Sequence, residues 1–353
     1  MSDLEKIPMF VGSYSKPDQA GLYSYEFSTQ NGEISFKEEV SGLENPSYLC
    51  LSAAGDRLFA VNEFKDGNRG KVTAYELTID KQTRYLSEVD YEGAGSCYIS
   101  IDSGSKHLFI ANYIGGSLVV LALNDEVNSM KPVQTINFSG SGPNAERQEK
   151  SHIHSAILST DEKYLYATDL GADRLYIFNY APESDEPIRP ADPLFVSLPP
   201  GCGPRHMVCH PSGRWLYLLC ELSGDLFVVE QGEFKDWIQV CNVTPKGATG
   251  KVEAADLQID SRGKRLYATN RGDFNQIIIF KIDEQNGKLG GVQFLFSQGN
   301  GPRSIALDPT EQYLVVANEK GNSIAMFDIS TDDGAIRYMG RRVEVHAPAC
   351  IKF

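Results

Sequence analysis

The chain has 353 residues, with 47 acidic and 33 basic side chains and a formal net charge of −14. This excess of acidic residues argues against a nucleic-acid-binding protein, which needs a basic surface to contact phosphates. Hydrophobic residues make up 41% of the chain and aromatic residues 10%, a composition that is typical of a globular protein and excludes a disordered or fibrous one.

The N-terminus begins Met-Ser-Asp-Leu-Glu-Lys, without the basic and then apolar stretch of a secretion signal. No apolar run approaches the roughly 18 to 20 residues that a membrane span needs. The seven cysteines are an odd number and contain no C-x-x-C pair, a pattern that favours reduced thiols over a disulfide framework or a zinc site. We therefore expect a cytoplasmic protein that is not attached to a membrane.

A unit of about fifty residues recurs along the chain. Its first complete copy contains PSYLCLSAAGDRLFAVNE (46–63), and each copy holds short runs rich in Val, Ile, Leu, Tyr and Phe, separated by tight turns. Such runs predict strands, and a four-stranded unit repeated end to end predicts a β-propeller. The small polar residue that ends the central run marks each of the six complete copies, at steps of 50, 57, 51, 50 and 48 residues: Asn62, Asn112, Asp169, Cys220, Asn270 and Asn318.

The two chain ends supply the parts of one further unit. Residues 8–13 resemble the second strand of a unit, and residues 347–353 resemble 45–51, the innermost strand of the first complete unit. We therefore expect an all-β, seven-bladed propeller in which the C-terminal strand closes the N-terminal blade and leaves no open inner edge. This predicts a single domain over residues 1–353.

The longest interruption of the repeat is the connection at 137–150, which leads into the histidine pair His152 and His154. Long connections in compact folds are often functional, but solvated excursions are as common. Both interpretations of this loop stay open.

In each blade, the start of the innermost strand and the end of its antiparallel neighbour meet at the same rim. Positions with a purely structural role should be alike in every blade, and these two positions are not. In the order of the blades, beginning with the shared one, the first position carries Ala349, Ser47, Cys97, His154, Arg205, Ala255 and Arg303. The second position carries Tyr14, Glu63, Tyr113, Leu170, Glu221, Arg271 and Glu319.

Ionisable side chains at these positions concentrate in blades four to seven, and Asp169 is adjacent to them. They predict a polar pocket of mixed charge at one mouth of the central channel. Three arginines around one axis form an anion receptor, because guanidinium binds carboxylate and phosphate through two points. Alternatively, the arginines only pair with Glu63, Glu221 and Glu319 to satisfy one another.

The sequence lacks the motifs of several common types of catalytic and cofactor site, and this limits the reactions that the ionisable residues could catalyse. His152 and His154 share a face if they lie on one strand, but no matching carboxylate or cysteine motif accompanies them, so we expect neither a metal nor a cofactor. We expect His206, which follows Arg205 on a strand, to point into the core between blades. There is no nucleophile elbow and no nucleotide-binding loop, and Cys97 has no histidine in its own blade. A histidine or glutamate base with arginines that stabilise an oxyanion suits the hydrolysis or closure of a lactone.

Segments along essentially the whole chain resemble the seven-bladed lactonase family, which includes propeller-type 6-phosphogluconolactonases and the fungal carboxy-cis,cis-muconate cyclase. They are Gly140 to Phe178, Gly203 to Ser223, Leu266 to Gly272, LFAVNE ending at Glu63, and GPRSIALDPTEQYLVVANE before Lys320. The resemblance implies a functional group made of a histidine from S-H-x-H, the arginine of G-P-R-H, the glutamate that ends that blade's second strand and the arginine of N-R-G. These motifs fall on His154, with His152 as the alternative, and on Arg205, Glu221 and Arg271. The sequence departs from the family at Asp273-Phe274, where a histidine is common, and this leaves the substrate open.

The resulting hypothesis is a metal-independent lactonase that acts on a small anionic sugar-acid lactone, with 6-phosphoglucono-δ-lactone of the pentose phosphate pathway as the candidate. His154 is the expected base and Glu221 the residue that orients a group, with Arg205 and Arg271 as the chief anion ligands. The further substrate-binding candidates are His152, Asp169, Arg303, Glu63 and Glu319. A muconate cycloisomerase and a non-catalytic binding propeller remain as alternatives. No nucleic-acid or membrane partner is expected, and the sequence does not indicate an oligomeric state.

Overall fold

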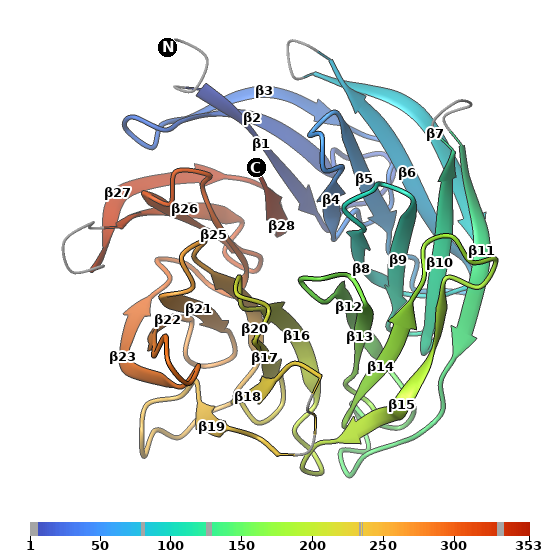
Figure 1. Cartoon of the computed structure of the whole chain (residues 1–353). Helices are drawn as coiled ribbons and strands as arrows, with labels where there is room; N and C mark the ends of the chain where they lie inside the picture. The colour runs from blue at the N-terminus through green and yellow to red at the C-terminus, as the bar shows by residue number, and fades with distance from the viewer. Residues whose placement is uncertain (1–5, 79–81, 125–128, 233, 235, 330–334) are drawn as a thin grey trace.

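The computed structural model describes residues 6–353 except 79–81, 125–128, 233, 235 and 330–334. Within these ranges the regular elements are 28 strands, arranged in seven four-stranded antiparallel sheets. The sheets stand around a central axis as the blades of a propeller (Figure 1). The predicted seven-bladed architecture is therefore confirmed.

The innermost strand of each blade lines the central channel, and its neighbour is the most deeply buried strand. The innermost strands, from blade 1 to blade 7, are β28 (Pro348–Lys352), β4 (Leu49–Leu51), β8 (Ser96–Ile101), β12 (Ile153–Leu158), β16 (Pro204–Cys209), β20 (Ala254–Ile259) and β24 (Pro302–Leu307). The second strands are β1 (Lys6–Ser13), β5 (Arg57–Asn62), β9 (His107–Asn112), β13 (Tyr164–Asp169), β17 (Trp215–Cys220), β21 (Arg265–Asn270) and β25 (Tyr313–Asn318). All six marker residues of the repeat are the last residues of second strands, as is Ser13 in blade 1.

The third and fourth strands complete each blade toward the outside. The third strands are β2 (Leu22–Ser28), β6 (Gly70–Leu77), β10 (Ser117–Asn124), β14 (Arg174–Tyr180), β18 (Asp225–Glu230), β22 (Gln276–Ile282) and β26 (Ser323–Ile329). The outer strands are β3 (Ile34–Val40), β7 (Thr83–Tyr91), β11 (Ser129–Asn137), β15 (Ile188–Ser197), β19 (Gln239–Asn242), β23 (Leu289–Phe296) and β27 (Ile336–Glu344). The outer strands are largely exposed on one or both faces, whereas β9, β17 and β25 are buried along their whole length.

The C-terminal strand closes blade 1. In Figure 1, β28 lies beside β1, and the two strands pair antiparallel with Phe10 opposite Lys352 and Gly12 opposite Cys350. Apolar side chains of blade 1, such as Met9 and Val11, pack in one cluster with those of blade 7. Full burial of one such side chain contributes about 1.5–3 kcal/mol, so the ring is joined by core packing as well as by strand pairing.

The innermost strands share an irregularity at the predicted rim position. The pairing register shifts there in six of the seven blades, which is the signature of a β-bulge and redirects the extra side chain out of the ladder. The residues at these shifts are Ala349, Cys97, His154, Arg205, Ala255 and Arg303. In blade 2, Ser47 precedes the short strand β4.

The described residues contain no helix long and apolar enough to cross a membrane. All seven cysteines are free thiols, as the sequence predicts.

Candidate functional site

A cavity of about 300 Å³ lies at the mouth of the channel where the bulges are. Six of the predicted site residues line it, and they come from blades 2 and 4–7. The complete lining is Glu63, Cys97, Tyr113, Arg147, His154, Glu221, Glu253, Arg271, Arg303, Glu319 and Lys320.

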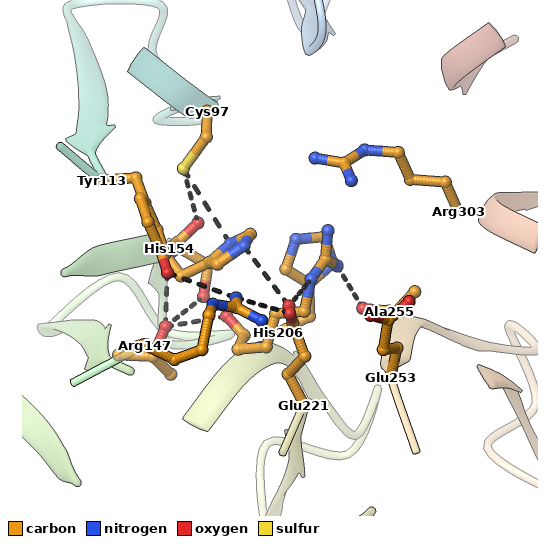
Figure 2. A network of polar contacts seen from close by, with 12 residues as sticks. Cys97, Tyr113, Arg147, His154, His206, Glu221, Glu253, Ala255 and Arg303 are labelled. Atoms are coloured by element: carbon orange, nitrogen blue, oxygen red, sulfur yellow. Dashed lines mark hydrogen bonds and ion pairs between the residues drawn. The ribbon is translucent and has the colours of Figure 1, made fainter. Parts of the chain in front are cut away.

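Glu221 is the centre of an ion-pair network (Figure 2). Its carboxylate accepts hydrogen bonds from Arg147 Nη2 at 2.7 Å and Arg205 Nε at 2.9 Å, and Arg271 Nη2 lies 3.2 Å from Oε2. Burial alone would raise the pKa of Glu221, but Arg271, Arg205 and Arg147 outweigh it and hold the pKa well below its usual range. Glu221 is therefore a carboxylate at neutral pH and a weak proton acceptor.

Arg205 pairs with this carboxylate but does not line the cavity. The side chain is 3% exposed, and its guanidinium also donates to the Ala255 carbonyl oxygen. Burial and the nearby Arg271 lower the pKa of Arg205 to about 10, so it remains a cation at neutral pH. Arg205 donates its hydrogen bonds to protein atoms, so it is suited to hold Glu221 in position rather than to bind a ligand.

His154 projects from the bulge at the start of β12. Its Nε2 lies 3.8 Å from Glu221 Oε2, and its Nδ1 lies 3.9 Å from the Cys97 sulfur, which belongs to the neighbouring blade. Burial, followed by the charge of Arg205, lowers the pKa of His154 well below its usual value. The imidazole is therefore neutral at physiological pH and can accept a proton.

Arg147 is a site residue that the sequence analysis missed, although the loop that carries it was considered as a functional candidate. Its Nη2 donates to Tyr113 Oη at 3.2 Å as well as to Glu221. The loop is held by Gln148, which is fully buried and donates to the Leu170 carbonyl and to Asp173 Oδ1, each at 2.8 Å. The loop at 137–150 therefore presents Arg147 to the cavity from a fixed support.

Two predicted substrate-binding residues lie outside the cavity lining. His152 stacks on Tyr113 with ring centroids 4.3 Å apart, and its Nδ1 lies 2.8 Å from the Tyr113 carbonyl oxygen. Asp169 Oδ1 accepts hydrogen bonds from the backbone amides of His152, Gly171 and Ala172. Both side chains support the loops that carry the lining residues.

His206 lies on the channel axis, which contradicts the expectation that it points into the core between blades. Its ring makes edge contacts with Tyr48, Tyr98 and His154, and its Nδ1 lies 2.8 Å from Asp256 Oδ1. These partners come from blades 2, 3, 4 and 6. The bulge at Arg205 shifts the alternation of the strand by one residue, so that two consecutive side chains face the channel.

A second polar cluster, which we call the Glu63 wall, consists of Ser47, Glu63, Tyr14, Arg303 and Glu319. Glu63 Oε2 accepts hydrogen bonds from Ser47 Oγ at 2.5 Å and Tyr14 Oη at 3.1 Å. Arg303 donates to Tyr14 Oη at 2.5 Å and to Glu319 Oε2 at 3.4 Å. Burial raises the pKa of Glu63. Figure 2 shows Arg303 on the other side of the network from Arg147, so guanidinium groups flank the cavity on two sides.

Among the described residues, no group of three or more His, Cys, Asp or Glu side chains could hold a metal ion. Three carboxylates of the cavity are paired with arginine or lysine: Glu221, Glu253 and Glu319. The fourth, Glu63, accepts hydrogen bonds from Ser47 and Tyr14. The absence of a metal from the reaction stays a prediction.

Comparison with known proteins places this chain in a family. Residues 8–353 match the family model described as "Lactonase, 7-bladed beta-propeller". A 6-phosphogluconolactonase of Bacillus subtilis is 31% identical over 351 residues, which cover 98% of this chain and 97% of the relative. A 6-phosphogluconolactonase of Formosa agariphila is also 31% identical, over 350 residues and 98% of each chain.

Two solved structures are similar over nearly their whole length. A proposed 6-phosphogluconolactonase from Bacteroides fragilis superposes with a TM-score of 0.92 at 31% identity and covers 100% of this chain and 99% of its own. The periplasmic gluconolactonase of Pseudomonas aeruginosa superposes with a TM-score of 0.90 at 32% identity over 98% of each chain. The similarity to these structures extends through all seven blades.

Proposed function

The chain belongs to the seven-bladed β-propeller lactonase family, and from this membership we propose that it hydrolyses a sugar-acid lactone in the cavity at the channel mouth. The first candidate substrate is 6-phosphoglucono-δ-lactone, because relatives that share almost the full length are named 6-phosphogluconolactonases. The cavity volume of about 300 Å³ suits a single small ring, since it lies at the lower end of the range for ligand pockets.

The observation that carries the proposal is a neutral histidine beside an arginine-rich wall. His154 would take a proton from water as the water oxygen attacks the lactone carbonyl carbon, and a tetrahedral oxyanion forms. When the ring C–O bond breaks, the imidazolium would return this proton to the leaving alkoxide. The low pKa of His154 in the free protein makes it a weak base, but the negative charge of a bound substrate favours the imidazolium and raises that pKa.

The anionic group of the substrate would bind to Arg271 and Arg147. Arg271 donates from Nε to the Glu253 carbonyl oxygen, and its Nη2 pairs with the Glu221 carboxylate. Arg147 donates both of its hydrogen bonds from Nη2. Within the described part of the chain, Arg271 Nη1 and both Nε and Nη1 of Arg147 donate to no protein atom. These N–H groups support two-point binding of phosphate or carboxylate. Arg205, which the sequence analysis ranked with Arg271, would act through Glu221.

The direct test is hydrolysis by the purified protein of freshly prepared 6-phosphoglucono-δ-lactone and, separately, of D-glucono-δ-lactone. Acid release is measured at constant pH, and the uncatalysed rate is subtracted. A parallel reaction after dialysis against a chelator tests metal independence, with full activity expected. Failure to accelerate either lactone, or cyclisation of carboxymuconate in their place, would overturn the proposal.

A further inference from the structure

A second cavity, which we call the outer groove, lies where blade 3 meets blade 4, between residues 134–139, 174–178 and 190–195. Its volume is about 470 Å³, within the range for ligand pockets, and it shares no lining residue with the cavity at the channel mouth. Gln134 joins the two blades, because its side chain donates to the Ile188 carbonyl oxygen at 2.7 Å and accepts the Ile188 amide at 3.1 Å. The two sides of the outer groove are therefore held together by hydrogen bonds.

Aromatic side chains form much of the lining, and they already pack against one another. The ring centroids of Phe138 and Tyr176 are 4.4 Å apart, and those of Tyr176 and Phe195 are 5.7 Å apart. Leu194 and Phe195 are each 37% exposed, although both are large apolar side chains. A ligand with an apolar body would remove this surface from water, and such burial is favourable.

Arg174 is the one charged side chain among the described residues that line the outer groove. Its guanidinium lies over the Phe195 ring, 4.4 Å from the centroid. Its Nη1 donates to the Ser139 carbonyl oxygen at 3.2 Å and to Tyr176 Oη at 3.1 Å. Within the described part of the chain, Arg174 forms no ion pair, and its Nε and Nη2 donate to no protein atom. Stacking on a ring occupies the face of a guanidinium, so the edge formed by Nε and Nη2 can still bind a carboxylate through two points.

We propose that the outer groove binds a small monocarboxylic acid with an apolar body, whose carboxylate pairs with Arg174 and whose body lies on the aromatic side chains. This site is additional to the proposed lactonase site and does not depend on it. The single positive charge favours an anion over a neutral or cationic ligand. The apolar lining disfavours a hydroxylated body, because buried hydroxyl groups without partners lose their hydrogen bonds to water.

Three ligands separate the contributions of the carboxylate and of the apolar body. 3-Phenylpropanoate carries both, 3-phenylpropanamide replaces the carboxylate with a neutral amide, and acetate keeps the carboxylate without the ring. Binding of each to the purified full-length protein is measured by calorimetric titration at neutral pH. We expect 3-phenylpropanoate to bind about tenfold or more tightly than either of the other two.

Substitutions then assign the binding to the outer groove. Arg174→Gln should weaken 3-phenylpropanoate binding by about tenfold or more and leave amide binding within about threefold. Leu194→Ser should weaken the binding of acid and amide alike, by about threefold or more. Arg189→Gln is the matched control, because Arg189 is an exposed arginine of the same blade that pairs with Glu186 and does not line the groove. Arg271→Gln tests binding at the channel mouth, and we expect it to leave the affinity for 3-phenylpropanoate within about twofold.

Several results would overturn the proposal. They are failure of 3-phenylpropanoate to bind, equal binding of acid and amide, and a loss of binding in Arg271→Gln that Arg174→Gln does not share. Sedimentation of the unsubstituted protein and of Leu194→Ser tests the other occupant, a second copy of the chain. A dimer that Leu194→Ser dissociates would assign the outer groove to self-association and overturn the acid site. If Arg174→Gln does not fold, Leu194→Ser and the comparison of acid with amide in the unsubstituted protein decide.

Discussion

Two residues of the cavity could activate water, and substitution of each one should give a different combination of rate and stability. His154→Gln keeps a polar side chain of similar size but removes the titratable ring. We expect kcat to fall by about 10²- to 10⁴-fold, which is the range for loss of general-base catalysis. The fold should be nearly unchanged, because the closest polar neighbours of His154, Glu221 and Cys97, lie 3.8 and 3.9 Å away.

Glu221→Gln should lower stability as well as rate. The substitution leaves Arg147, Arg205 and Arg271 without their shared carboxylate, and Arg205 is 3% exposed. Removal of one partner from a buried ion pair costs about 3–5 kcal/mol. For a chain of 353 residues, an unfolding entropy of about 0.7 kcal/mol per degree converts this cost to a Tm decrease of about 4–7 °C.

Rates come from acid release at constant pH after subtraction of the uncatalysed hydrolysis, and Tm comes from scanning calorimetry in the same buffer. His346→Gln is the matched control for the histidine substitution, because His346 is exposed and lies outside the cavity. Because burial and Arg205 lower the pKa of His154, the acid limb of kcat/KM in the unsubstituted protein should lie well below pH 6.5. A His154→Gln variant with near-normal rate, together with an inactive Glu221→Gln variant of unchanged Tm, would identify Glu221 as the base and refute this reasoning.

Four further predictions concern other parts of the molecule. Arg147→Lys should raise KM for an anionic lactone by about tenfold with a smaller effect on kcat, because lysine keeps the charge but loses the planar fork; an unchanged KM would exclude Arg147 from the anion site. Deletion of residues 347–353 should give aggregated protein or a broad, non-cooperative melting transition, because it removes β28 from blade 1; unchanged calorimetry would count against closure and against a single cooperative domain. Burial and Arg205 lower the pKa of His206 to about 4, below its unfolded value of about 6.5. The contribution of His206 to the free energy of unfolding should therefore be fully present above pH 6.5, and about 3 kcal/mol of it should be lost as the pH falls toward 4. Denaturant titrations in which the free energy of unfolding of His206→Gln changes with pH as steeply as that of the unsubstituted protein would contradict this. Burial and Glu63 raise the pKa of Cys97, so Cys97→Ser should retain kcat within about threefold, and stoichiometric inactivation by iodoacetamide at this residue would show otherwise.

The fold could be predicted from the sequence because the same pattern of short apolar strands and tight turns occurs in each of the seven blades. Each copy has a short apolar strand that ends in a small polar residue, and the structure uses this residue to bond the adjacent loop. Asn62 Oδ1, for example, accepts the Glu44 amide, and Asn270 Oδ1 accepts the Glu253 amide. A residue with a repeated structural function is recognisable in a single sequence, and its spacing therefore predicts the blade boundaries.

The site could be predicted only where it coincides with the repeat. His154, Glu221 and Arg271 occupy rim positions, and comparison of the blades with one another identifies them. Arg147 has no counterpart in the other blades, because its loop is an insertion, and the comparison passes over it. Its placement depends on Gln148 reaching Leu170 and Asp173, which are long-range contacts that no local pattern records.

The bulges explain why the rim positions can differ so widely in a fold made of similar units. A residue at a bulge is extra to the pairing of its strand, so its side chain is not restricted by a cross-strand neighbour as a regular ladder residue is. Small residues such as Ala255 and Ala349 leave room at the channel mouth, while His154, Arg205 and Arg303 at equivalent positions bring charge and hydrogen-bonding groups to it. The ladder on either side keeps the same apolar pattern in every blade. Substitution at these positions therefore changes the chemistry of the cavity more readily than it changes the packing that holds the propeller together.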